Sequence, residues 1–155
     1  MLMCALRDGA HGAKVNGIAG SSNRGADSIV VSGAYDGMDI DDGDTIHYSG
    51  SDSHENIDPK TPRISASTEA MQRANKLRKV IRVIRSSRGK WSGVPTVGFR
   101  YDGLYKITRE CIEKNAKGGA YIRFTLMREP DQPPIDFGRP TRRERLEFNW
   151  VRNHY

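Results

Sequence analysis

The sequence has few cysteines, few aromatic residues and no long hydrophobic run, and each absence excludes a class of protein. Cys4 and Cys111 are its two cysteines, and neither lies in a metal-ligand spacing, so we expect no disulfide scaffold and no zinc site. Such usage fits a reducing intracellular compartment. The apolar opening over residues 1–6 is too short for a secretory signal or a bilayer span. We therefore expect a soluble protein without a membrane segment.

The motifs of common catalytic sites are also missing. The sequence contains no GxSxG, no glycine-rich phosphate loop before a helix and no Cys-His pair with a family spacing. Its four histidines are scattered along the chain. These absences favour a protein that is not an enzyme and that holds neither a metal nor a cofactor.

The length and composition indicate one domain. A chain of 155 residues with 36% hydrophobic residues can cover a single core. Sixteen glycines and scarce helical patterns favour strands and turns over a helix bundle. We expect a flexible arm over residues 1–13 and a single domain over residues 14–155.

Five segments have strand patterns. β-Branched runs, alternation of residue types and flanking turn residues identify them. The predicted strands cover residues 28–35, 46–48, 79–85, 105–108 and 119–129. The fourth is expected to begin after a turn at the Tyr-Asp-Gly run of residues 101–103.

Helical spacing is weaker. Ala70, Ala74 and Leu77 fall on one stripe and predict a helix over residues 68–77. The polar, proline-containing segment 49–66 is expected to be a mobile excursion. Residues 141–150 fit either a short terminal helix or an edge segment.

The net charge of +6 is unevenly distributed. Residues 27–58 contain nine acids and no Lys or Arg, whereas residues 71–101 contain nine basic residues and no acid. A basic block of this kind attracts a polyphosphate backbone, which makes nucleic acid the leading partner. The alternative is a solvated helix face and strand edge that needs no ligand.

The acidic residues gather in the loop 39–44, for which two uses are open. Asp41, Asp44 and His47 could hold a divalent ion in a metal-dependent nuclease, although no second half of such a site is evident. Alternatively, Tyr35 and Tyr48 could stack on a base taken out of a duplex while Asp39 accepts from the amino group of a cytosine. A purely structural turn with half-buried tyrosines is the third interpretation.

Several stretches, taken together in this order, resemble the SRA domain, also called the YDG domain. The resemblance covers about residues 14–129, and its ordered combination is far more specific than a single Tyr-Asp-Gly. The stretches are KVNGIAGSSNRGADSIVVSGAYDG (14–37), DDGDTIHYSGS (41–51), KVIRVIR (79–85) and FRYDGLYKI (99–107).

This resemblance implies an α+β, mainly β fold, in which a curved, barrel-like mixed sheet of the PUA-like type carries flanking helices. It also implies a monomeric reader of double-stranded DNA that flips 5-methylcytosine into a pocket. Such domains occur in the nucleus beside chromatin modules and in bacterial endonucleases. Chromatin proteins are therefore possible partners.

The resemblance also assigns residues to roles. The implied base pocket consists of Tyr35, Asp39, Tyr48, Ser49, Ser32, Gly33, Ala34 and Ser51. Val15, with Lys14 beside it, corresponds to a thumb that enters the space left by the flipped base. Arg63 corresponds to the finger loop that reads the opposite strand. For the DNA backbone we expect contacts from Arg73, Lys76, Arg82 and Arg85.

Three functions therefore stay open at this stage. The first is a reader of methylated DNA, the second is a metal-dependent nuclease that uses the acidic loop, and the third is a nucleic-acid binder indifferent to sequence and methylation.

Overall fold

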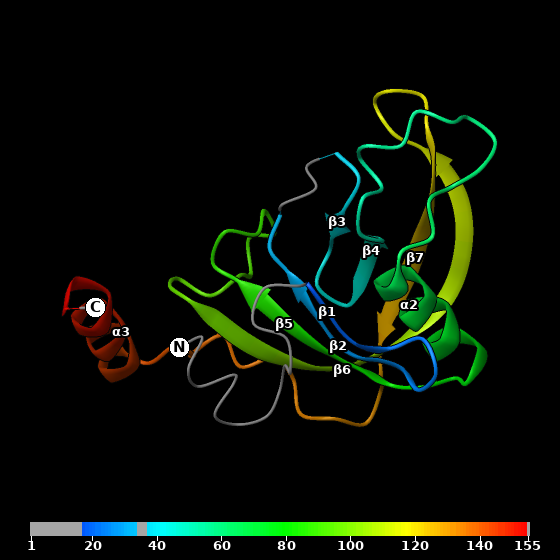
Figure 1. The fold of residues 1–155 in the computed structure, drawn as a ribbon. Helices are drawn as coiled ribbons and strands as arrows, with labels where there is room; N and C mark the ends of the chain where they lie inside the picture. Colours follow the sequence, from blue (N-terminus) through cyan, green and yellow to red (C-terminus); the bar gives the residue numbers. More distant parts are fainter. Residues whose placement is uncertain (1–16, 34–36, 155) are drawn as a thin grey trace.

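Seven strands form one mixed sheet in the computed structural model, which describes residues 17–33 and 37–154 (Figure 1). The strands are β1 (Ile18–Ser21), β2 (Gly25–Val31), β3 (Ile40–Asp41), β4 (Thr45–Ser49), β5 (Ile81–Ser86), β6 (Phe99–Lys114) and β7 (Ala120–Arg128). Their order in the sheet is β1-β2-β5-β6-β7-β4-β3. Only the pairing of β2 with β5 is parallel, because α2 (Ala66–Lys76) lies in the long connection that returns the chain to β5.

The sheet curls until β4 approaches its opposite end. The hydroxyl of Tyr48, on β4, lies 3.2 Å from the carbonyl oxygens of Gly17 and Val30, to which it donates. Among the described strands no ladder joins β1 to β3, so the curled sheet is not a closed barrel. The predicted α+β, mainly β fold with a curved sheet is confirmed.

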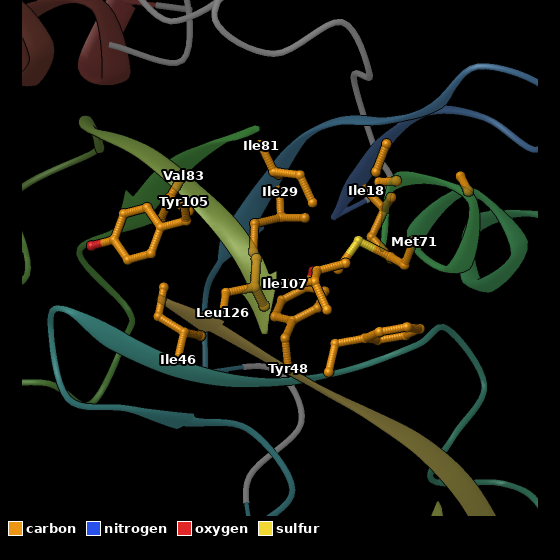
Figure 2. Packing of buried hydrophobic residues seen from close by; sticks show 14 of the residues in the cluster. Ile18, Ile29, Ile46, Tyr48, Met71, Ile81, Val83, Tyr105, Ile107 and Leu126 are labelled. Atoms are coloured by element: carbon orange, nitrogen blue, oxygen red, sulfur yellow. The ribbon is translucent and has the colours of Figure 1, made fainter. Parts of the chain in front are cut away.

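The core fills the inside of this curve. Figure 2 shows Ile29 of β2, Ile46 and Tyr48 of β4 and Leu126 of β7 directed toward one another. Met71 of α2 is fully buried against the same cluster, and the Oγ of Ser65 caps that helix by accepting from the backbone N–H of Thr68 at 3.2 Å. The cap explains why the helix begins two residues before the start predicted from the apolar stripe.

The prediction of a turn at residues 101–103 was wrong. These residues lie inside β6, where the pairing with β5 slips by one residue between Val83 and Ile84 and makes a bulge at Asp102. Gly103 has φ of 109°, and a Cβ there would lie 2.7 Å from the side-chain oxygen of Gln132. Glycine is thus required at this position by the bulge and by the close approach of Gln132, and not by a reversal of the chain.

The segment 49–66, predicted to be mobile, is fastened to the β6–β7 hairpin. The side-chain amide of Asn56 donates to the backbone oxygens of Thr61 at 2.9 Å and Ala120 at 2.8 Å. The amide of Asn115 donates in return to the oxygens of Ser53 and Asn56. Both asparagines are buried, so these bonds replace water contacts that their amides would otherwise lose.

The C-terminal segment resolves the choice between helix and edge segment. Residues Arg142–His154 form α3, which stands apart from the sheet and buries none of its residues (Figure 1). No helix in the described ranges is long and apolar enough to cross a membrane. The predicted arm over residues 1–13 lies outside the described residues.

Candidate functional site

The described part of the predicted pocket centres on Asp39, one residue before β3. Its Oδ1 accepts hydrogen bonds from the backbone N–H of Ser49 at 2.8 Å and from the Ser49 hydroxyl at 2.7 Å. Both bonds fall on the same oxygen, and Ser49 is itself buried at the end of β4. The carboxylate is therefore oriented through one oxygen while the other receives no bond from the described residues.

Burial raises the pKa of Asp39 from 3.8 to about 6. The hydrogen bonds from Ser49 and the positive charge of Arg123 act in the opposite direction and lower it. Near neutral pH the group is mostly ionised, which makes it an acceptor of hydrogen bonds. A carboxylate whose pKa is raised by burial and that borders a cavity is a candidate for a functional site.

Asp39 borders a cavity of about 180 Å³. Its lining consists of Val31, Gly33, Asp39, Ile40, Asp41, Lys90 and Trp91. The sites of drug-sized ligands are larger, roughly 300–1,000 Å³, so this volume suits a small planar group. Gly33 and Asp39 belong to the predicted pocket, and the structure brings them together here.

Trp91 and Lys90 were missed by the sequence reasoning. Trp91 belongs to the loop between β5 and β6, and its ring lies so close to Gly43 that a Cβ there would be 2.7 Å from Cζ2. A lone tryptophan within a Ser- and Gly-rich loop was the available signal. Its contact with the acidic loop could not be read from the sequence, because 48 positions separate the two residues.

The other predicted pocket residues have different surroundings. The Tyr48 ring is only 3% exposed and packs in the core, so its stacking role stays a prediction. The Ser51 hydroxyl shares a hydrogen bond of 2.6 Å with the hydroxyl of Ser67, and Ser32 is half-buried. The remaining pocket and thumb residues lie outside the described residues: Lys14, Val15, Ala34 and Tyr35.

Arg85 is not available for the DNA backbone, which corrects our prediction. Its side chain has no exposed surface and binds Asp41 through two nitrogens, Nε to Oδ2 and Nη2 to Oδ1, both at 2.8 Å. Its Nη1 donates to Asp102 at 3.0 Å. Burial opposes a charged guanidinium, but the bonds to Asp41 outweigh it and raise the pKa of Arg85.

The same network explains the second Tyr-Asp-Gly run. Asp102 accepts from Arg85 and from both Nε and Nη2 of Arg100, and its side chain has no exposed surface. The Tyr105 hydroxyl donates to the carbonyl oxygen of Gly43 at 2.7 Å. Residues of β5 and β6 therefore anchor the acidic loop, and Asp102 has a structural role in this network.

The metal-dependent nuclease receives no support from the arrangement of the acidic loop. Within residues 17–33 and 37–154 no group of three His, Cys, Asp or Glu side chains is placed to hold a metal ion. Asp41 is bound to Arg85, and Nδ1 of His47 shares a hydrogen bond of 3.1 Å with the hydroxyl of Thr125.

The remaining predicted DNA contacts lie at the surface or near it. Arg73 and Lys76 are exposed on α2, where Nε of Arg73 donates to the carbonyl of Asn23 at 3.1 Å. Arg82 is half-buried on β5, and Arg63 is exposed in the segment before α2. All four remain candidates for phosphate contacts.

Comparison with known proteins gives a consistent result. The sequence model of the SAD/SRA domain matches residues 1–132, which include the whole sheet but not α3. The UHRF1-like protein of Cryptococcus neoformans is 31% identical over an alignment of 148 residues, gaps included, and the alignment covers 86% of this chain and 43% of that protein. The chain thus spans less than half the length of this relative.

Two solved structures share the fold. The modification-dependent TagI restriction endonuclease has a TM-score of 0.71 and 29% identity over 83% of this chain and 47% of its own. The SRA domain of SUVH5, solved in complex with methylated CHH DNA, has a TM-score of 0.68 and 28% identity over 86% of both chains.

Proposed function

Because the chain belongs to the SAD/SRA domain family, we propose that it binds duplex DNA containing 5-methylcytosine and receives the modified base, turned out of the helix, beside Asp39. The observation that carries the proposal is the half-satisfied carboxylate. Ser49 holds one oxygen of Asp39, and the side chain borders a cavity of about 180 Å³.

The chemistry of this carboxylate suits cytosine. Cytosine presents an exocyclic amino group as a donor, and a carboxylate is a good acceptor for it. Since Ser49 already orients Asp39, little further ordering is needed when the base enters. Gly33 also lines the cavity and carries no side chain, which leaves its backbone accessible to the base edge.

The stacking and methyl-reading parts of the proposal rest on the family resemblance. Tyr35 and Tyr48 stack on the base, the backbone of Ser32 and Ala34 lines the pocket, and Ser51 lies near the methyl group. Val15 and Lys14 fill the gap left in the duplex. Stacking on aromatic rings contributes roughly 1–3 kcal/mol per base, comparable to the few kcal/mol needed to unstack one.

Phosphate contacts come from the surface cations in this proposal. Arg73, Lys76 and Arg82 hold the distorted duplex, and Arg63 approaches the opposite strand as the finger residue. Each neutralised phosphate adds salt-dependent affinity without any preference for sequence.

In this proposal the chain acts as a reader rather than as a catalyst. It functions as a monomer in the nucleus, next to chromatin proteins that carry other activities. Localisation of the tagged full-length protein by microscopy tests the nuclear part, and an exclusively cytoplasmic signal contradicts it.

The decisive experiment compares affinities for three duplexes that differ only in one CpG: unmodified, hemimethylated and fully methylated. At a fixed salt concentration we expect tighter binding to at least one methylated duplex. Equal affinity for all three refutes the modification-reading part and favours the indifferent nucleic-acid binder.

A cleavage assay on the same duplexes tests the nuclease. We expect intact DNA with magnesium and with manganese. Cleavage that disappears after chelation of the metal refutes a purely non-enzymatic role.

A further inference from the structure

Arg123 is placed beside the residue that orients Asp39. In the β4–β7 ladder, Arg123 is the partner of Ser49, whose N–H and hydroxyl both donate to Asp39. Alternation along β7 sends Ile122, Phe124 and Leu126 into the core. Arg123 therefore points away from the core, to the same face of the sheet as its ladder partner Ser49.

The guanidinium of Arg123 is held in place without being fully paired. Its Nη2 donates to the buried hydroxyl of Tyr121 at 3.0 Å, and its Nη1 is 3.9 Å from Glu113. Its Nε is the one buried side-chain nitrogen or oxygen in residues 17–33 and 37–154 that lacks a hydrogen-bond partner. A buried donor without a partner costs stability, so the contacts with Tyr121 and Glu113 do not fully satisfy this guanidinium.

The charge of Arg123 acts on Asp39. Burial raises the pKa of the Asp39 carboxyl, whereas Arg123 lowers it together with the two bonds from Ser49. The other charged groups around the site are Lys90 and Asp41 at the cavity and Glu113 on β6. Asp41 is already neutralised by Arg85, and Glu113 is exposed at the surface.

We propose that Arg123 is a positioning residue that keeps Asp39 an acceptor and thereby makes the cavity prefer a base with an exocyclic amino group over one with a carbonyl. This inference rests on the proposed function. The two bases to be distinguished are 5-methylcytosine and thymine, which carry the same methyl group. At position 4 the first has an amino group and the second a carbonyl oxygen.

The reason is the direction of the hydrogen bond. An ionised carboxylate accepts from the amino group but repels a carbonyl oxygen, because both groups then present lone pairs. A protonated carboxyl can donate to that carbonyl, so loss of the neighbouring positive charge weakens the discrimination.

The test uses duplexes with one central 5-methylcytosine·G pair or one T·G mismatch, with binding measured by fluorescence anisotropy at pH 6 and at pH 7.5. The mismatch ensures that thymine is not disfavoured by stronger pairing, since a mismatched base costs least to extrude. The wild-type protein is expected to prefer 5-methylcytosine at least tenfold. Arg123→Gln lowers this preference by at least about twofold at pH 6, where Asp39 is close to its pKa of about 6, and by less at pH 7.5, where the carboxyl stays ionised. Arg123→Lys restores most of the preference.

Arg109→Gln is the matched control. Arg109 is exposed on β6 opposite Thr125, two residues along β7 from Arg123. The substitution removes the same charge and is expected to change binding to both duplexes by the same factor.

The outcomes separate this inference from the proposed function. If the wild-type protein binds methylated and unmodified duplexes equally, the proposed function fails and the inference with it. If it reads the methyl group but Arg123→Gln keeps the wild-type preference for 5-methylcytosine over thymine, the inference alone is refuted. A loss of affinity that is equal for both duplexes also refutes it.

A second variant covers the case in which Arg123→Gln does not fold. Glu113→Gln removes the exposed carboxylate that faces Arg123 and is expected to increase the preference for 5-methylcytosine over thymine. An unchanged preference in that variant refutes the inference.

Discussion

Asp39 and Asp102 both belong to or follow a Tyr-Asp-Gly run, but their surroundings are opposite. Asp102 has no exposed surface, and both of its oxygens accept from the guanidinium groups of Arg85 and Arg100. Asp39 has one oxygen bound to Ser49 and borders a cavity. The same tripeptide thus accompanies a saturated carboxylate in the scaffold and a half-satisfied one at the candidate site.

The difference shows how the fold distributes its electrostatic costs. A buried carboxylate is tolerated when its partners replace the lost water, as the two arginines do for Asp102. Asp39 forms no ion pair with a residue that the structure describes, and burial raises its pKa to about 6. The ion pair between Asp41 and Arg85 therefore stabilises the acidic loop. Asp39, two residues earlier, keeps a carboxylate whose burial is unfavourable.

The largest expected effect on stability follows from removing Asp102, the carboxylate whose two oxygens are both paired. Asp102→Ala leaves two buried guanidinium groups without their common partner, and we expect a loss of about 3–5 kcal/mol in the free energy of unfolding. Urea unfolding followed by circular dichroism measures it.

The matched control for this substitution is Asp42→Ala, because Asp42 is exposed in the acidic loop and its backbone is not left-handed. It is expected to change stability by less than about 0.5 kcal/mol. If Asp102→Ala unfolds at the wild-type urea concentration, the buried network does not hold the loop.

A smaller effect concerns the pH dependence of stability at Asp39. Its folded-state pKa of about 6 lies above the ordinary value of 3.8, so the folded protein keeps the proton over a range in which the unfolded chain loses it. The stability from this group is full below pH 3.8 and is lost as the pH rises through 6. The difference between the two values corresponds to at most about 3 kcal/mol.

Asp39→Asn isolates this contribution. Urea unfolding of the wild type and the variant between pH 4 and 7.5 should show the wild type losing stability relative to the variant as the pH rises. Parallel curves would contradict the raised pKa.

The sequence predicted the strands and helices of the scaffold better than it predicted the residues around Asp39. Branched runs and apolar spacing identified β2, β5 and α2 to within a few residues, because local patterns largely determine such elements. Asp39 was identified from its place in a family motif. The register of the loop and the neighbours of the carboxylate needed the structure.

Long-range pairing explains the misses. Arg85 looked like any other cation of the basic block, and only its contact with Asp41, 44 residues earlier in the chain, shows that it is buried. The sequence does not predict that Arg123 lies beside Ser49, because this position depends on the pairing of β4 with β7. One-dimensional charge patterns do not reveal such partners.

Replacing Asp39, the half-satisfied carboxylate, tests its role in the affinity for methylated DNA. Asp39→Asn replaces a carboxylate oxygen by an amide, whose N–H₂ can face the cytosine amino group donor to donor. We expect the preference for methylated over unmodified duplex to fall by about tenfold or more, with non-specific binding unchanged. Anisotropy titrations with both duplexes measure it.

Asp41→Asn is the control for the register of the loop. Its carboxylate is bound to Arg85, so we expect lower stability and an unchanged methyl preference in the protein that remains folded. If Asp41→Asn abolishes the preference and Asp39→Asn does not, the assignment of the acceptor is wrong by two residues.

The smallest expected effect is on the salt dependence of DNA binding, and it distinguishes the exposed cations of α2 from the buried Arg85. Arg73→Gln and Lys76→Gln each remove an exposed charge from α2 and should reduce the slope of log affinity against log salt concentration by about 0.9. The preference for methylated DNA should stay unchanged, because phosphate contacts carry no information about the base. Arg85→Met should instead lower the urea midpoint, since it leaves Asp41 without its ion-pair partner and removes one of the two arginines that bind Asp102. Binding titrations between about 50 and 200 mM salt measure the slopes, and urea unfolding measures the midpoint of Arg85→Met. A slope that Arg73→Gln and Lys76→Gln both leave unchanged removes α2 from the proposed DNA contact.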